Sequence, residues 1–169
     1  WKAVSPRGLR KKYLDHTRYR KAPVYLLCAG AFVASDFHIV RAYPDKMFKW
    51  GYFPEYKEYD IEMLMQEKKP GEILWAARFI DWKHPELVVA AARELKNRGK
   101  KFHITMVGDG PLRPQTEAMI IQAGLQECFT LTGAISPKEV RIHMEKASIY
   151  LMTSDRKEGW GAVMNEAMN

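Results

Sequence analysis

Two basic side chains in one short segment are of the right kind, and at a suitable spacing, to bind a phosphorylated ligand. Arg78 and Lys83 lie five positions apart, with Asp81 as the one acid between them. Arginine binds a diphosphate through two parallel hydrogen bonds and lysine binds it as a point charge, so the pair could clamp a diphosphate. Two solvated loop charges would show the same spacing, and the sequence by itself leaves both interpretations open.

A second segment, 158–166, encloses seven residues between two glutamates and reads Glu-Gly-Trp-Gly-Ala-Val-Met-Asn-Glu. Gly159 and Gly161 open a predicted helix, whose free N–H groups and positive dipole end form an anion site. Glu166 falls among small and apolar residues, where a carboxylate needs a polar partner and could accept both hydroxyls of a ribose. Alternatively, Glu158 is an acid favoured by the helix dipole and Glu166 faces solvent.

A glycine pair marks a third segment, Val107-Gly108-Asp109-Gly110-Pro111. Two glycines allow a close backbone approach and positive φ angles. Their spacing differs from the G-x-G-x-x-G of dinucleotide-binding enzymes. A tight turn before a helix explains the segment at least as well as a ligand site does.

The elements that must position these segments alternate regularly from residue 72 onward. The predicted strands are 73–77, 102–107, 129–132 and 149–152. The predicted helices are 85–97, 114–123, one that opens at Ser136-Pro137 with a capping box to Glu139, and 161–168. These repeats predict an α/β fold, a Rossmann-like parallel sheet with helices on both faces. Ligands of such sheets lie beyond the carboxyl ends of the strands, where all three segments fall.

The preceding part of the chain predicts a separate β-α-β unit with a linker. Its strands are expected at 24–29 and 46–52, with a helix at 31–42 between them. Residues 55–70 are charged and mixed, which indicates a linker with a helical turn near 61–65.

Composition and charge narrow the class of protein. Hydrophobic residues make up 47% of the chain, which excludes wholesale disorder. The net charge of +7 lies wholly in residues 1–22, which hold eight basic residues and one acid, so a nucleic-acid protein is disfavoured. No apolar run reaches the ~18–20 residues of a membrane-spanning helix. Cys28 and Cys128 are expected to be buried thiols in a reducing compartment rather than zinc ligands.

The motifs, each after a predicted strand, resemble the nucleotide-sugar half of family 4 retaining glycosyltransferases with the two-domain B-type fold. They are Ala77-Arg78 with Lys83, the Gly108 to Gly110 segment, Leu131-Thr132-Gly133, and the Glu-x7-Glu segment. The resemblance implies a remnant of the acceptor-side domain at 1–54, a linker at 55–70, and a nucleotide-sugar-binding domain, truncated at its C-terminal end, at 71–169. The chain opens with Trp1-Lys2, and such enzymes are about twice this long, so we expect a fragment that is inactive alone.

The resemblance also implies roles for individual residues. Arg78 and Lys83 would hold the donor diphosphate, Glu166 would bind the ribose, and Glu158 would be the catalytic residue beside the transferred sugar. The other implied donor-binding residues are Gly108, Asp109, Gly110, Gly133, Ile135, Gly159, Trp160 and Gly161. No metal site and no cofactor are expected, because the cations and a helix terminus neutralise the leaving diphosphate. The sequence departs mildly from the family where Ala77 replaces a frequent glycine and Trp160 replaces phenylalanine or tyrosine.

The expected reaction is transfer of a sugar, with retention, from a nucleotide-diphosphate sugar to a glycan or lipid-linked acceptor. By analogy with the family, the product would be a bacterial surface polysaccharide such as capsule or lipopolysaccharide. The expected location is the cytoplasm. Residues 1–22, which we call the basic head, are expected to lie against the anionic inner face of the membrane, and no nucleic-acid partner is expected. A non-catalytic nucleotide- or phosphate-binding module is the alternative, and a nucleic-acid binder that uses residues 1–22 is a third reading.

Overall fold

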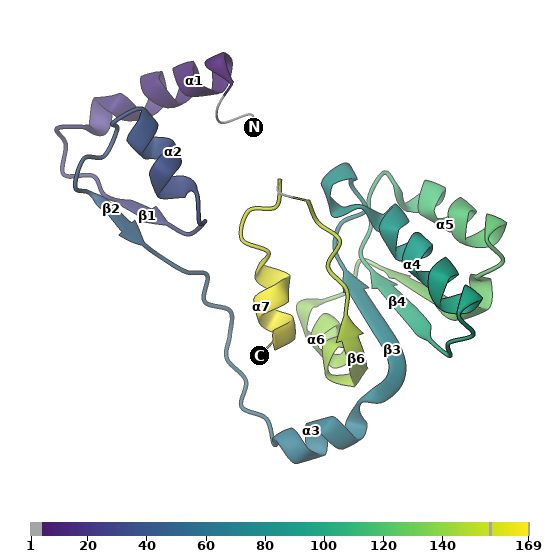
Figure 1. Ribbon diagram of the computed structural model, residues 1–169. Helices are drawn as coiled ribbons and strands as arrows, with labels where there is room; N and C mark the ends of the chain where they lie inside the picture. The colour runs from purple at the N-terminus through teal and green to yellow at the C-terminus, as the bar shows by residue number, and fades with distance from the viewer. Residues whose placement is uncertain (1–4, 156, 169) are drawn as a thin grey trace. The chain divides into compact units, whose positions relative to one another are not determined.

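The computed structural model describes residues 5–155 and 157–168, and the chain divides into two compact units (Figure 1). The first unit is Trp1–Phe53 and the second is Pro54–Asn169. Each unit has its own parallel sheet.

The first unit is a small β-α-β arrangement that follows an N-terminal helix. Its elements are α1 (Pro6–His16), the 3-10 turn η1 (Thr17–Tyr19), β1 (Leu26–Cys28), α2 (Val33–Ile39) and β2 (Met47–Lys49). β1 and β2 pair in parallel, as the sequence predicts, although both strands are shorter than expected. The ammonium of Lys46 donates hydrogen bonds of 2.7–3.1 Å to the carbonyls of Tyr19, Arg20 and Ala22, which fastens the basic head to this unit.

The second unit contains a four-stranded parallel sheet in the order β5-β4-β3-β6. The strands are β3 (Lys69–Ala76), β4 (His103–Val107), β5 (Phe129–Gly133) and β6 (Ala147–Tyr150). The helices and 3-10 turns are α3 (Ile61–Glu67), η2 (Asp81–Lys83), α4 (Pro85–Asn97), α5 (Arg113–Gln122), η3 (Gln126–Cys128), α6 (Pro137–Lys146) and α7 (Ala162–Met168). This confirms the predicted Rossmann-like architecture.

Different helices cover the two faces of this sheet (Figure 1). Successive side chains of a strand point to opposite faces. Ile73 and Trp75 of β3 therefore pack in one core cluster with residues of α4 and α5, whereas Leu74 and Ala76 pack in a second cluster with residues of α6 and α7. Two hydrophobic layers thus hold β3 in the middle of the unit.

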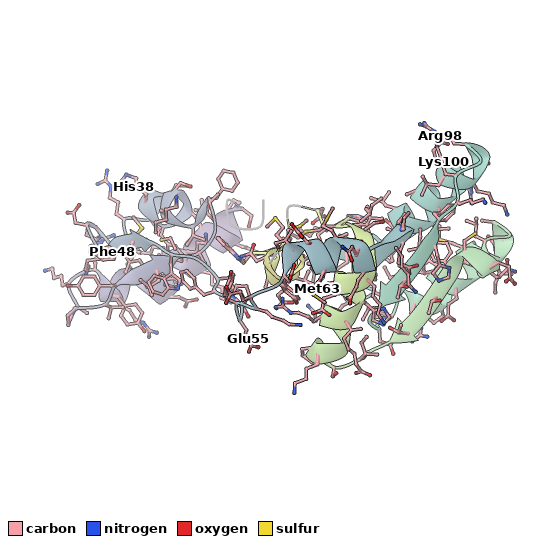
Figure 2. All side chains as sticks on the ribbon, turned by 90° about the horizontal axis from the view of Figure 1, so that it is seen from below. His38, Phe48, Glu55, Met63, Arg98 and Lys100 are labelled. Atoms are coloured by element: carbon pink, nitrogen blue, oxygen red, sulfur yellow. The ribbon has the colours of Figure 1, made fainter. Side chains whose placement is uncertain are left out.

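Local signals explain where the helices begin. Pro85 occupies the first turn of α4, and Pro137 occupies the first turn of α6. The capping box of α6 is present: the hydroxyl of Ser136 accepts the Glu139 amide at 3.3 Å, and the Glu139 carboxylate accepts the Ser136 amide at 2.8 Å. After α4, Arg98 and Lys100 lie exposed around the turn that leads to β4 (Figure 2).

Among residues 5–155 and 157–168, no helix is long and apolar enough to cross a bilayer. Cys28 is buried and Cys128 is half-buried, and both are free thiols.

Candidate functional site

The carboxyl ends of β3, β4, β5 and β6 point to one edge of the sheet, because all four strands are parallel. We call this edge, with the segments that follow the strands, the carboxyl edge. It collects residues 77–84, 108–112, 134–136, 151–155 and 157–161. All three sequence segments with candidate chemistry therefore reach the same edge, as expected for ligand sites of open parallel sheets.

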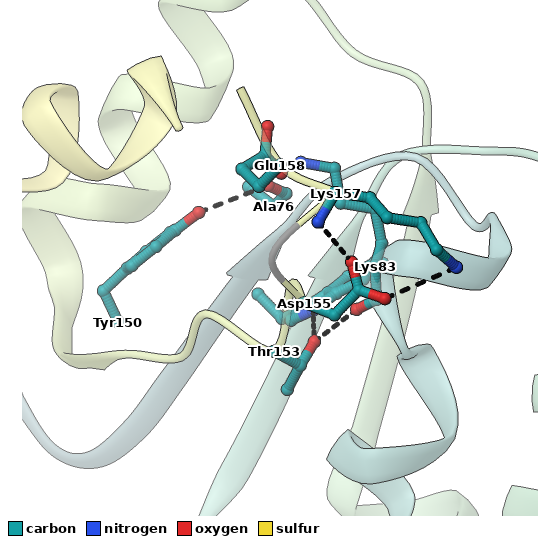
Figure 3. Close-up of polar contacts among 8 residues, drawn as sticks. Ala76, Lys83, Tyr150, Thr153, Asp155, Lys157 and Glu158 are labelled. Carbon is teal, nitrogen blue, oxygen red and sulfur yellow. Dashed lines mark hydrogen bonds and ion pairs between the residues drawn. The ribbon is translucent and has the colours of Figure 1, made fainter. Parts of the chain in front are cut away.

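Lys83 and Glu158 meet at the carboxyl edge although they lie 75 positions apart in the chain (Figure 3). The Lys83 ammonium donates to a Glu158 carboxylate oxygen, and their side chains are only 12% and 22% exposed. Burial by itself would raise the pKa of Glu158, but hydrogen bonds from Lys83 and Ser154 outweigh burial and hold that pKa below its usual value. Glu158 is therefore ionised at neutral pH, and a phosphate group could take the place of its carboxylate on Lys83.

A hydrogen-bonded support fixes the backbone beneath this pair. The hydroxyl of Thr153 donates to the carbonyl of Lys83 at 2.5 Å and accepts the indole N–H of Trp75 at 2.8 Å. The Asp155 amide donates to the Trp82 carbonyl at 3.0 Å. The segments after β3 and β6 are therefore tied together. Sequence reasoning missed Thr153, although a buried tryptophan in a strand needs a partner for its N–H.

Arg78 lies at the same edge, just beyond the end of β3, and its side chain is exposed. Within residues 5–155 and 157–168, none of its side-chain atoms takes part in an ion pair or hydrogen bond. Its guanidinium is thus available to an anion, whereas the Lys83 ammonium is already bound to Glu158.

The glycine segment after β4 packs against the segment after β3. Gly108 has a φ of 129°, and a Cβ there would lie 2.0 Å from the Ala77 carbonyl oxygen; at Gly110 a Cβ would lie 2.6 Å from the Phe79 carbonyl oxygen. The Phe79 amide donates to the Asp109 carbonyl at 2.9 Å. This close backbone approach explains the two glycines without a ligand, and it also fixes the loop at the edge.

Gly133 ends β5 in a similar way, and a cation lies over it. Its carbonyl accepts the Gly108 amide at 2.9 Å, and a Cβ at this position would lie 3.1 Å from Nη1 of Arg113. Arg113 also pairs with Glu117 at 2.8 Å and lies 3.8 Å from Asp109. Arg113 was not predicted as a site residue, although its four-residue spacing from both acids was a usable signal. Ile135 packs with the core cluster beneath α6 and α7.

Glu166 and Glu158 both act on the phenol of Tyr150. The Tyr150 hydroxyl donates to the Ala76 carbonyl at 3.2 Å (Figure 3). Burial raises the pKa of Tyr150 strongly, and the carboxylates of Glu166 and, more weakly, Glu158 raise it further. Both ends of the Glu-x7-Glu segment therefore lie within electrostatic reach of one half-buried phenol. Glu166 also lines a 450 Å³ pocket with residues of α6 and the 55–57 segment.

The glycines before α7 differ in their surroundings. Gly159 and Trp160 are exposed, whereas Gly161 is buried with a φ of 70°. A Cβ at Gly161 would lie 2.8 Å from the methyl group of Met152, while nothing within 4 Å would obstruct one at Gly159. The Gly161 carbonyl accepts the Met164 amide at 2.8 Å, which begins the turn of α7.

Residues 57–169 match the sequence model of the family described as glycosyl transferases group 1, and the chain belongs to this family. The fold is the B-type glycosyltransferase fold of family 4-like enzymes. Its likeness to HepE from Anabaena, solved in complex with UDP and glucose, has a TM-score of 0.71 at 15% identity and covers 98% of this chain and 46% of that one.

Curated relatives match part of the chain. The 2-deoxystreptamine glucosyltransferase of Streptomyces kanamyceticus is 37% identical over 87 residues, which are 52% of this chain and 21% of that protein. The amylovoran biosynthesis glycosyltransferase AmsK of Erwinia amylovora is 28% identical over 100 residues, which are 59% of this chain and 25% of that protein. The chain thus spans about a quarter or less of these relatives.

Proposed function

We propose that the chain is the nucleotide-sugar-binding part of a retaining glycosyltransferase. The observation that carries this proposal is the Lys83–Glu158 pair at the carboxyl edge, together with the exposed guanidinium of Arg78 at the same edge. Family membership supports sugar transfer as the reaction, and the pair supplies groups of the right charge for both halves of a nucleotide sugar.

In the proposed mechanism, Arg78 and Lys83 bind the donor diphosphate and neutralise the charge that develops as the nucleoside diphosphate leaves. Cations placed where the negative charge develops stabilise such a transition state electrostatically. Glu158, released from Lys83 by the incoming phosphate, accepts hydroxyl groups of the transferred sugar. The charge neutralisation comes from the two side chains, so we propose a reaction without a metal ion or cofactor.

The remaining candidate residues are proposed to bind the nucleoside. Glu166 accepts the ribose hydroxyls, and its electrostatic effect on Tyr150, which Glu158 shares, supports this role. The segments that contain Gly108, Asp109 and Gly110, and Gly133 with Ile135, line the base. The Gly159, Trp160 and Gly161 backbone faces the phosphate and the sugar.

The proposed acceptor is a glycan or a lipid-linked sugar, and the proposed product is a surface polysaccharide. Relatives named for amylovoran biosynthesis and, as a provisional assignment, for colanic acid biosynthesis support a polysaccharide product, and we propose capsule or lipopolysaccharide as its class. Since the chain covers at most about half of HepE, we propose that this part by itself binds donor without completing transfer.

We also propose that the protein acts in the cytoplasm, with peripheral contact to an anionic membrane through its basic head. α1 presents three exposed basic side chains, Arg7, Arg10 and Lys11, and the exposed apolar side chains of Tyr13 and Leu14. Basic residues close to an anionic leaflet contribute about 1 kcal/mol each to binding.

Calorimetric titration with UDP, GDP and ADP tests donor binding. We expect one nucleotide to bind the unmodified chain, and Arg78→Ala and Lys83→Met to weaken it by roughly tenfold or more, since a hydrogen bond to a charged group contributes about 1.5–3 kcal/mol. Lys100→Ala, which removes an exposed cation after α4, is the matched control and should leave affinity unchanged. Equal effects of all three substitutions, or no binding of any nucleotide, would contradict the proposal.

A further inference from the structure

His84 follows Lys83 directly and has an unusual backbone conformation. Its φ of 47° and ψ of 57° lie in the left-handed region, immediately before α4. A side chain with a Cβ pays roughly 1–2 kcal/mol there, and glycine or asparagine is the usual occupant. The presence of an imidazole at such a position points to contacts that the ring makes.

Both ring nitrogens of His84 face carboxylates from different elements. Nδ1 lies 2.8 Å from a Glu86 carboxylate oxygen on α4, and Nε2 lies 3.5 Å from an Asp155 carboxylate oxygen in the segment after β6. A neutral imidazole has one N–H, whereas an imidazolium donates from both nitrogens. Only the protonated ring can therefore donate to both carboxylates at once.

The charges around the ring favour protonation. The hydrogen bond to Glu86, and then that to Asp155, raise the pKa of His84 above its ordinary value of 6.5. His84 lines a pocket together with Asp81 of η2 and Glu86 of α4. The residues that line this pocket from α5 and the position before it are uncharged: Leu112, Gln115, Thr116 and Met119. The opposing cation is Lys157, which lies 3.5 Å from Asp155.

Asp155 also connects the ring to the candidate catalytic pair. Its amide is bonded to the Trp82 carbonyl, and its own carbonyl accepts the Glu158 amide at 3.0 Å. Lys83 precedes His84 on the other side of this bridge. A contact between His84 and Asp155 thus links the backbone that carries Lys83 to the backbone that carries Glu158.

We propose that protonated His84 is a positioning residue that bridges Glu86 and Asp155 and so holds the backbone segment that carries Glu158 against the segment that carries Lys83 in the donor site. This inference rests on the proposed function. The bridge is complete while the ring is charged and is lost as the pH rises through the pKa of folded His84, above 6.5. Donor affinity therefore decreases from pH 6 to pH 8.5.

Calorimetry with a nucleotide sugar tests the bridge, because its diphosphate does not titrate in this pH range. UDP-glucose, GDP-mannose and ADP-glucose are the probes. We expect affinity for the one that binds to fall about two- to fivefold between pH 6 and pH 8.5, the range of a partly exposed ion pair. His84→Asn, which tolerates the left-handed backbone, should bind with little dependence on pH. His103→Asn, at the other edge of the sheet, should keep the unmodified profile.

A second readout separates this inference from the proposed function. By NMR, Asp155→Asn should move the pKa of His84 back toward 6.5. The exchange protection of the Asp155 and Glu158 amides should fall with rising pH in the unmodified chain but not in His84→Asn. If no nucleotide sugar binds, the proposed function fails, and amide protection still decides the bridge. Identical pH profiles of His84→Asn and the unmodified chain in protection, or in affinity where a sugar nucleotide binds, would overturn it.

Discussion

At the scale of single residues, the site is defined by the ion pair between Lys83 and Glu158. The Lys83–Glu158 pair lies largely out of solvent, and the Trp75–Thr153 hydrogen bond supports it. A partly buried ion pair is costly to break by removal of one partner, because the other charge is left without compensation. The pair therefore stabilises the carboxyl edge, and it also positions the Lys83 ammonium where a phosphate can bind.

Acidification should test the charge state of Glu158. Its folded pKa is lowered, so it adds stability above the unfolded value of 4.5 and this contribution is lost as the pH falls through the folded pKa. We expect Glu158→Gln to lose less stability than the unmodified chain between pH 6 and pH 3.5, by up to about 1 kcal/mol, in urea unfolding. Glu127→Gln, an exposed acid on η3, is the control and should follow the unmodified chain. Parallel curves for all three proteins would refute a charged pair.

Several residues of the site were predictable from sequence, and others were not. Arg78, Lys83 and Glu158 belong to ordered motifs, so their arrival at one edge follows from the strand–helix rhythm. The direct contact between Lys83 and Glu158 depends on the path of two loops, which no local pattern specifies. His84 and Asp155 were missed for the same reason, because their meeting is a tertiary contact between segments about 70 positions apart in the sequence.

At the scale of elements, helix bounds were more predictable than strand bounds. Local residues such as proline and glycine mark where a helix begins and ends, whereas the extent of a strand depends on its tertiary pairing. α4 has the predicted bounds, since Pro85 opens it and Gly99 follows it. β3 begins at Lys69, inside the expected linker, because its backbone already pairs with Ala147. The start of β3 was not predictable from the sequence, because Pro70 and Gly71 are both poor strand residues. Their position in a strand depends on tertiary pairing.

Substitution of the loop glycines tests how the segments after β3 and β4 are joined. Gly108→Ala places a Cβ 2.0 Å from the Ala77 carbonyl oxygen, so we expect a loss of about 3 kcal/mol or more in the free energy of unfolding. Gly99→Ala, with a φ of 62° and open space around the new atom, should cost only about 1 kcal/mol. Chemical denaturation measures both, and equal losses would show that the close approach does not constrain Gly108.

At the scale of the whole molecule, charge and donor chemistry belong to different parts of the chain. The net charge of +7 lies in residues 1–22, within the first unit, whereas the candidate site lies in the second. The structure adds that several basic side chains of the head already have partners: Lys12 pairs with Asp36, and Arg20 donates to the Arg41 carbonyl. The net charge therefore relates to the proposed attraction to an anionic membrane and not to donor binding.

Co-sedimentation with phosphatidylglycerol vesicles tests that attraction. The triple substitution of Arg7, Arg10 and Lys11 by glutamine should weaken binding roughly a hundredfold, at about 1 kcal/mol per basic residue, and leave nucleotide affinity intact. The matched control replaces Lys100, Lys101 and Lys138, three exposed lysines of the second unit, by glutamine. Equal losses in the two triple variants would show that overall charge, and not α1, governs the attraction.

The most direct test of the account is to locate the nucleotide on the chain. Backbone amide shifts in a ¹⁵N-labelled sample titrated with the nucleotide that binds in calorimetry would report the site. We predict that the largest changes fall on 78–84, 108–112, 134–136 and 158–161, which belong to the carboxyl edge. Changes confined to the opposite edge of the sheet, at His103 and His143, or spread over the first unit, would contradict the proposed donor site.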